Sequence, residues 1–262
     1  MEYLYEEINK YGKVRSDEAM SKHTTIQIGG PVDYFVFVET EEDLVNLLQV
    51  LDGDGVGYFI FGRGGNVLVS DQGYKGIAIK YEDNEMKIED SKLIVDAGAD
   101  IVKTAQYAMR NNLTGLEFGI GTRGSIGGVV CHNDIILDTE VSDLIHGLKI
   151  YKDGEVLDYS KEECRFDHDD FILGQPGVVL LEVVFDLEKS EENDSGEKTM
   201  KYIHYKNNNL PLSHPYIGPV FKKIPKEKVN LNWFSEEVKE TLEKKDMIQP
   251  EKVQVETTET HG

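Results

Sequence analysis

Apolar residues recur along the chain with two different periods, and these periods predict where strands and helices lie. Residues 32–38 (VDYFVFV) form a β-branched and aromatic run, which is typical of a strand. Thr40 and the acidic residues after it predict a helix start, and leucines between residues 44 and 51 share one helical face. A helix is also predicted at residues 2–11, with strands at 59–61, 67–69 and 76–80. A first α+β unit therefore ends near residue 80.

A second unit follows, with a different order of elements. The pattern predicts a hairpin at residues 81–93, a strand at 93–98 and a helix at 101–111 that buries Ile101, Val102, Ala105, Ala108 and Met109. Asp153-Gly154 between alternating runs predicts a second hairpin at 148–157, and residues 178–187 read as a core strand. Residues 188–200 are polar and predict a linker, and a later helix is predicted at 235–245. The predicted organisation is two subdomains, 1–80 and 81–190, followed by a linker and C-terminal region at 191–262.

The composition narrows the class of protein. The chain has 262 residues, 39% of them hydrophobic, which fits a globular protein with a sizeable core. No apolar run reaches the roughly 18 residues that span a bilayer, and the acidic N-terminus lacks a signal-peptide layout. We therefore expect a cytoplasmic protein. The two cysteines, Cys131 and Cys164, lack metal-ligand spacing and are interpreted as buried thiols.

The net charge of −21 limits which partners the protein can bind. Such an acidic chain repels nucleic acid and anionic membranes, so neither is an expected partner. An anionic ligand would need local help from backbone N–H groups or arginines. Of the five arginines, Arg63 and Arg123 lie within glycine-rich runs. This placement favours an anion site there, with a solvated loop arginine as the alternative.

The glycine-rich runs at residues 62–65 and 119–128 are the main candidates for chemistry. Glycines permit positive φ angles and close approach, and successive N–H groups in such a loop bind anions such as phosphate. The first run does not match the better-known phosphate-binding signatures: it lacks the Gly-Lys-Ser/Thr ending of a P-loop and the helix that a dinucleotide-binding βαβ unit requires. Each alone could be an ordinary hairpin turn. Together they indicate a long ligand with a central diphosphate.

Three motifs in order resemble one enzyme family. The motifs are His23–Pro31, Gly62–Gly73 and Gly115–Asn133, and they resemble those of the UDP-N-acetylenolpyruvoylglucosamine reductases. That family consists of FAD-containing enzymes of peptidoglycan precursor synthesis. The resemblance implies an α+β FAD-binding fold of the vanillyl-alcohol-oxidase type, with two α+β subdomains and a reduced C-terminal substrate domain. It also implies FAD as cofactor.

The resemblance extends residue by residue to both flavin loops. The matching positions, with the two loop arginines added, are Gly62, Arg63, Gly64, Gly65 and Asn66, then Gly121, Arg123, Gly124, Ser125, Ile126, Gly127, Gly128 and Asn133. Thr122-Arg123 replaces the usual Ile-Pro pair. Residues 134–138 replace the family's Ala-Gly-Ala-Tyr-Gly, which changes contacts near the far end of the flavin.

The catalytic positions of the family are altered. Its proton-donor serine corresponds to Pro219, which has neither O–H nor N–H and cannot act as a general acid. Its Tyr-Arg pair corresponds to His168 and Asp169, so an anion replaces a cation. The family's C-terminal glutamate lies in the part that we expect to be shortened, and neither Glu251 nor Glu256 matches it. The resemblance therefore implies a protein that is inactive or altered in that reaction.

Two alternatives remain open. One is an active NADPH-dependent flavin oxidoreductase that acts on UDP-N-acetylenolpyruvoylglucosamine or a related UDP-sugar; the other is a flavin-binding protein with a regulatory or scaffolding role and a protein partner. A metal cluster of residues 167–170 with His132 or His204 is chemically conceivable for a hard cation. On a chain with 49 acidic residues such a run favours a solvated loop, so no metal is expected.

Overall fold

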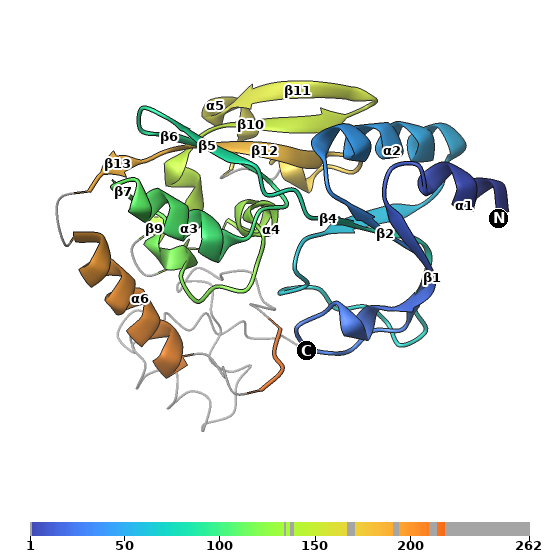
Figure 1. The fold of residues 1–262 in the computed structure, drawn as a ribbon, viewed down its shortest axis with the longest axis horizontal. Helices are drawn as coiled ribbons and strands as arrows, with labels where there is room; N and C mark the ends of the chain where they lie inside the picture. The colour runs from blue at the N-terminus through green and yellow to red at the C-terminus, as the bar shows by residue number, and fades with distance from the viewer. Residues whose placement is uncertain are drawn as a thin grey trace, which may run out of the picture. The chain divides into compact units, whose positions relative to one another are not determined.

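The computed structural model describes residues 2–133, 135–136, 139–166, 171–190, 194–209 and 214–217. The chain divides into two compact units, Met1–Gly218 and Pro219–Gly262. The second unit, with the helix predicted at 235–245, lies outside the described residues. Figure 1 shows the strands and helices of the first unit. Most of its strands belong to two main sheets.

The first sheet holds the N-terminal strands. Its order is β1-β2-β4-β3, with β1 antiparallel to β2 and both β2 and β3 parallel to β4. The strands are β1 (Lys13–Ala19), β2 (Pro31–Val38), β3 (Tyr58–Phe61) and β4 (Tyr74–Tyr81), and the helices of this part are α1 (Glu2–Ile8) and α2 (Glu41–Asp54). Helix α2 connects β2 to β3. The first glycine loop starts at Gly62, directly after β3 ends.

Local chemistry explains α2 and β2. Thr40 caps α2, its side chain accepting a hydrogen bond from the Asp43 N–H at 3.1 Å, and Gly55 ends the helix with φ 64°. The buried residues of α2 are Leu44, Leu47, Leu48 and Leu51, as predicted. The run of β2 is apolar at nearly every position because both faces of the strand are covered: Val36 lies in the main core and Phe35 in a smaller second core.

The second sheet is antiparallel, in the order β11-β10-β12-β6-β5. Its strands are β5 (Met86–Glu89), β6 (Lys92–Asp96), β10 (Ile145–Lys152), β11 (Glu155–Ser160) and β12 (Val179–Asp186). The predicted hairpin around Asp153-Gly154 is confirmed, and both turn residues have positive φ angles of 52° and 86°. The central position of β12 explains why residues 178–187 are almost continuously apolar.

Shorter elements connect and cover this sheet. The helices are α3 (Ile101–Arg110), α4 (Ile126–His132), α5 (Lys161–Cys164) and α6 (Asp194–Asn209), with 3₁₀ turns η1 (Met20–Lys22), η2 (Glu117–Gly119), η3 (Val141–Leu144) and η4 (Ile172–Gly174). Two small ladders pair β7 (Leu113–Thr114) with β13 (Glu188–Lys189) and β8 (Ile135–Ile136) with β9 (Thr139–Glu140). Helix α4 packs on β6 and β12 (Figure 1). The main core joins residues of both sheets, from Val36 to Phe185.

Three local predictions were wrong. Residues 67–69 form no strand; the Ser70 carbonyl there accepts hydrogen bonds from the Gly30 and Gly73 N–H groups, at 2.9 Å each, instead of a strand ladder. The predicted linker at 188–200 contains β13 and the start of α6. Its polar composition hid the helix because few α6 side chains, such as Tyr202, are buried. Cys131 is exposed, whereas Cys164 is buried as predicted.

Among the described residues, no helix combines the length and the apolar content needed to cross a membrane.

Candidate functional site

The first glycine loop is held by the segment that precedes β2. Gly64 is buried with φ 66°, and a Cβ there would collide with the carbonyl oxygen of His23. The Thr25 N–H donates to the Gly64 carbonyl at 3.0 Å, and the Thr25 hydroxyl lies 3.3 Å from the same oxygen. The His23–Pro31 motif therefore fixes the conformation of the first loop. Sequence reasoning singled out this motif but did not foresee the role of Thr25.

The second glycine run begins as a loop and then becomes a helix start. Gly121 has φ 74°, and the N–H of Ile101 donates to the Gly124 carbonyl at 3.3 Å. Ser125 caps α4, accepting a hydrogen bond from the Gly128 N–H at 3.2 Å. Ile126 is fully buried, and the Gly127 N–H donates to the Ala97 carbonyl at 2.7 Å. The second half of this run therefore anchors α4 to the second sheet.

The two glycine loops meet directly, although about 60 residues of chain separate them. A Cβ on Gly62 would overlap the Ser125 hydroxyl, and one on Gly65 would overlap the Arg123 carbonyl. Glycine is therefore required at both positions by loop-to-loop packing. The structure brings together the two runs that the sequence predicted to share one ligand.

Both loops carry free backbone donors. Within the described residues, no hydrogen-bond acceptor takes the N–H groups of Gly64, Gly65 and Asn66, or those of Gly121, Arg123 and Gly124. Arg123, Gly121 and Asn66 are exposed. In the described part of the chain, a Cβ on Gly121 would have only one neighbour within 4 Å, the Lys206 Cδ at 3.7 Å. Accessible N–H groups beside open space suit a phosphate-containing ligand such as FAD.

The two loop arginines have different environments. Arg63 forms an ion pair with Asp100 at 3.1 Å, and its side chain is 51% exposed. Asp100 also caps α3 by accepting hydrogen bonds from the Val102 and Lys103 N–H groups. The Arg123 guanidinium lies over the ring of Tyr216, 5.2 Å from its centroid. Both cations lie beside the free N–H groups, but Asp100 offsets part of the charge of Arg63.

Tyr216 links the second glycine loop to the segment that holds the first loop. Its carbonyl accepts a hydrogen bond from the Thr25 hydroxyl at 2.9 Å, while its ring contacts Arg123. Nothing in the local sequence around Tyr216 indicated this contact. Tyr216 thus contacts Arg123 of the second loop and Thr25, the residue that holds the first loop.

Asn133, predicted as a flavin contact, has structural partners. It ends α4 in the left-handed region with φ 45°. Its amide donates to the Glu140 carboxylate at 3.1 Å, and its side-chain oxygen accepts from the Ser142 N–H at 2.9 Å. The predicted contact of Asn133 with the cofactor stays a prediction.

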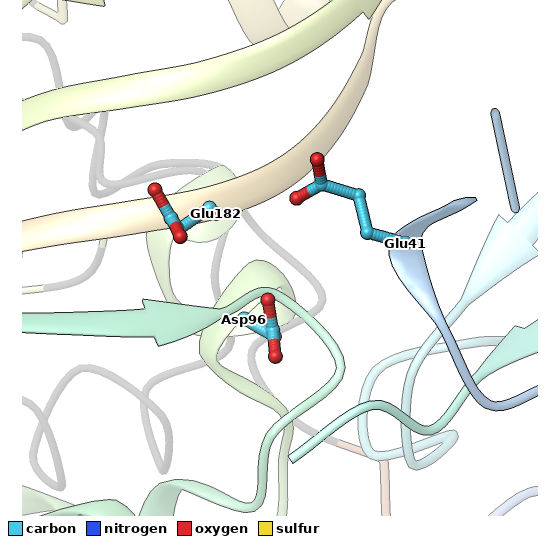
Figure 2. Close-up of side chains that lie close together, drawn as sticks. All are labelled: Glu41, Asp96 and Glu182. Atoms are coloured by element: carbon cyan, nitrogen blue, oxygen red, sulfur yellow. The ribbon is translucent and has the colours of Figure 1, made fainter. Parts of the chain in front are cut away.

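A separate group of carboxylates joins α2 to the second sheet. One carboxylate oxygen each from Glu41, Asp96 and Glu182 lies within 4.8 Å of the others, and Figure 2 shows the three side chains facing one another. The Lys149 ammonium lies 3.3 Å from Glu41 and 3.3 Å from Glu182, so a lysine supplies the positive charge between them. Burial, and then the charge of Asp83, raises the pKa of the Asp96 carboxyl to about 7.

The altered catalytic positions cannot be placed. Pro219, His168, Asp169, Glu251 and Glu256 all lie outside the described residues, as does the acidic run at 167–170. Of the histidines considered with that run, His204 lies on α6, where its Nε2 is 2.9 Å from the Asn208 amide nitrogen. His132 is the last residue of α4.

Comparisons with known proteins agree with this geometry. Residues 32–160 match the model of a family described as an FAD binding domain. The UDP-N-acetylenolpyruvoylglucosamine reductase of Clostridium tetani is 35% identical over 212 residues, which cover 80% of this chain and 69% of that protein.

Solved structures give the same result. The UDP-N-acetylenolpyruvylglucosamine reductase of Thermus caldophilus superposes with a TM-score of 0.69 at 25% identity, covering 82% of this chain and 76% of that one. An alkyldihydroxyacetonephosphate synthase has a TM-score of 0.58 at 13% identity, covering 72% of this chain and 40% of that one, and so shows likeness of fold alone. The fold is thus an α+β FAD-binding fold of the vanillyl-alcohol-oxidase type, as predicted.

Proposed function

Because the chain belongs to the UDP-N-acetylenolpyruvoylglucosamine reductase family and has FAD as its cofactor, we propose that its two glycine loops hold FAD while the ordinary family reaction is lost or altered. The observation that carries the site is the direct contact of the loops, with free N–H groups on both. These groups would bind the diphosphate, helped by Arg63 and Arg123. On a chain of net charge −21, local donors of this kind have to overcome a repulsive field.

The chain's own residues would bind and orient the cofactor. Thr25 holds the first loop through the Gly64 carbonyl and contacts the Tyr216 carbonyl. Ser125 fixes the start of α4 and the side of the second loop that touches Gly62. When bound, FAD supplies the capacity to accept and transfer hydride.

The loss of the ordinary reaction is proposed from the sequence. Pro219 occupies the position of the family's proton donor, and Asp169 that of its arginine. Loss of a positioned proton donor lowers a rate by roughly 10²–10⁴-fold. Loss of an electrostatic stabiliser lowers it by roughly 10²–10³-fold, although residues that act as a unit do not add.

The second candidate is an active NADPH-dependent reductase with a UDP-sugar substrate. The 35% identity to the Clostridium tetani enzyme over 80% of this chain favours it. We propose that the protein is cytoplasmic under both candidates. Under the first candidate, we propose that it has a regulatory role and binds a protein partner.

The experiment supplies NADPH and UDP-N-acetylenolpyruvoylglucosamine to FAD-loaded protein and follows NADPH consumption. We expect no rate above the oxidase background. Substrate-dependent turnover of about 1–10³ per second would establish the second candidate. In that case His168→Ala and His214→Ala would be the first variants to test for a replacement proton donor. Protein that stays colourless after incubation with FAD and gel filtration would remove the proposed FAD site.

A further inference from the structure

Helix α6 sends one lysine into the second glycine loop. Lys206 is only 6% exposed, although it belongs to a residue type that is almost never fully buried without a partner. Its ammonium donates to the Ile120 carbonyl at 2.7 Å, to the Thr122 hydroxyl at 2.5 Å and to the Phe118 carbonyl. The three N–H groups of the ammonium therefore all end on residues 118–122, on both sides of Gly121.

These contacts fix a part of the loop that the rest of the fold leaves open. The 3₁₀ turn η2 ends at Gly119, and Gly121 follows with φ 74°. Of the residues that the structure describes, only Lys206 would lie within 4 Å of a Cβ on Gly121, so the lysine supplies packing on that side. Of the N–H groups without an acceptor among the described residues, that of Gly121 lies within residues 118–122, which Lys206 holds, and those of Arg123 and Gly124 come directly after them.

Neutral oxygen atoms, and not a carboxylate, surround the positive charge of Lys206 within the described residues. Among the described residues, no carboxylate forms an ion pair with its ammonium, and oxygen dipoles alone surround it. Two other charged groups on the neighbouring segments have partners of their own: Glu117 bonds Thr114 and the Gly115 N–H, and Arg123 lies over Tyr216. Burial lowers the pKa of the Lys206 ammonium to about 8. A buried positive charge without a carboxylate favours a nearby anion.

We propose that Lys206 is a positioning residue for FAD, which acts by holding residues 118–122 so that the N–H groups of Gly121, Arg123 and Gly124 face the diphosphate. The proposal rests on the assignment of the second glycine loop to FAD. The readout is FAD affinity, so the result does not depend on whether the reductase activity is retained.

The test measures FAD affinity of the full-length apoprotein by quenching of flavin fluorescence. Lys206→Met removes three hydrogen bonds from a charged donor, so we expect at least about tenfold weaker binding. Lys206→Arg keeps the charge but not the shape of the ammonium, so its affinity should lie between those of the wild type and Lys206→Met. Lys198→Met is the matched control, because Lys198 lies on the same helix but donates to Thr114, which is outside residues 118–122.

A pH series separates positioning from mere stabilisation. As pH rises from 7 to 9, the Lys206 ammonium loses a proton and one donor, so wild-type affinity should fall several-fold, whereas Lys206→Arg should show no such fall.

Thr122→Val removes one acceptor of the ammonium and should weaken binding even if Lys206→Met fails to fold. The proposal is overturned if Lys206→Met binds FAD within about twofold of wild type. It is also overturned if Lys198→Met weakens binding equally, or if Thr122→Val and the rise in pH leave affinity unchanged.

Discussion

Replacement of Asp96 by asparagine should stabilise the protein at alkaline pH. Asp96 ends β6 and is 6% exposed, with its Oδ2 atom lacking a hydrogen-bond partner among the described residues. It faces Glu41 and Glu182 in the carboxylate group of Figure 2. The hydroxyl of Tyr81, also buried and unpartnered within the described residues, has its pKa raised by burial and then by the charge of Asp96. An ionised Asp96 is therefore poorly solvated.

The sign of the effect follows from the pKa. Burial and the charge of Asp83 raise the pKa of Asp96 from its ordinary value of 3.8 to about 7. Between these two pH values the folded protein holds a proton that the unfolded chain releases, so stability falls as pH rises through this window. A shift of this size corresponds to an upper limit of about 4 kcal/mol. Because Lys149 and the other carboxylates share the charge, we expect Asp96→Asn to gain roughly 1–3 kcal/mol at pH 8.

The assay is urea unfolding of the apoprotein, followed by far-ultraviolet circular dichroism at pH 4.5 and pH 8. The gain should be large at pH 8 and small at pH 4.5, where wild-type Asp96 is itself neutral in the folded state. Asp90→Asn is the control, since Asp90 is exposed in the turn between β5 and β6 and has φ 58°, which asparagine tolerates. The reasoning fails if Asp96→Asn is less stable than wild type at pH 8, or if the gain is the same at both pH values.

Two further changes test the glycine loops and their support. Gly62→Ala places a Cβ on the Ser125 hydroxyl and should weaken FAD binding at least about tenfold in a fluorescence titration, whereas Gly53→Ala, with open space around it, should leave binding unchanged. Glu18→Gln should lower the free energy of unfolding at pH 7 by roughly 1–2 kcal/mol, because the hydrogen bond from His23 and those from Arg15 and Lys22 hold the pKa of Glu18 at about 2. That contribution is present above about pH 4.5 and is lost as pH falls towards 2, so a loss of stability that is equal at pH 7 and pH 3 would contradict it.

Local sequence determined the elements whose signals are self-contained. Thr40 with the leucines of α2 specified that helix, because a cap and one apolar face are both properties of a short segment. Asp153-Gly154 specified the β10–β11 hairpin in the same way, since its turn needs positive φ angles that these residues tolerate. The glycine runs also indicated a ligand with a diphosphate, and the family resemblance identified the cofactor as FAD.

Tertiary structure alone decided what the apolar and charged groups contact. Val67–Val69 has the composition of a strand but forms none, and the Ser70 carbonyl that follows accepts hydrogen bonds from the loop residues Gly30 and Gly73. Arg63 was predicted for the cofactor, yet its partner in the structure, Asp100, lies 37 residues further along the chain. The contact of Gly62 with Ser125 and the reach of Lys206 into residues 118–122 depend on packing between distant segments, and no local pattern encodes such a distance.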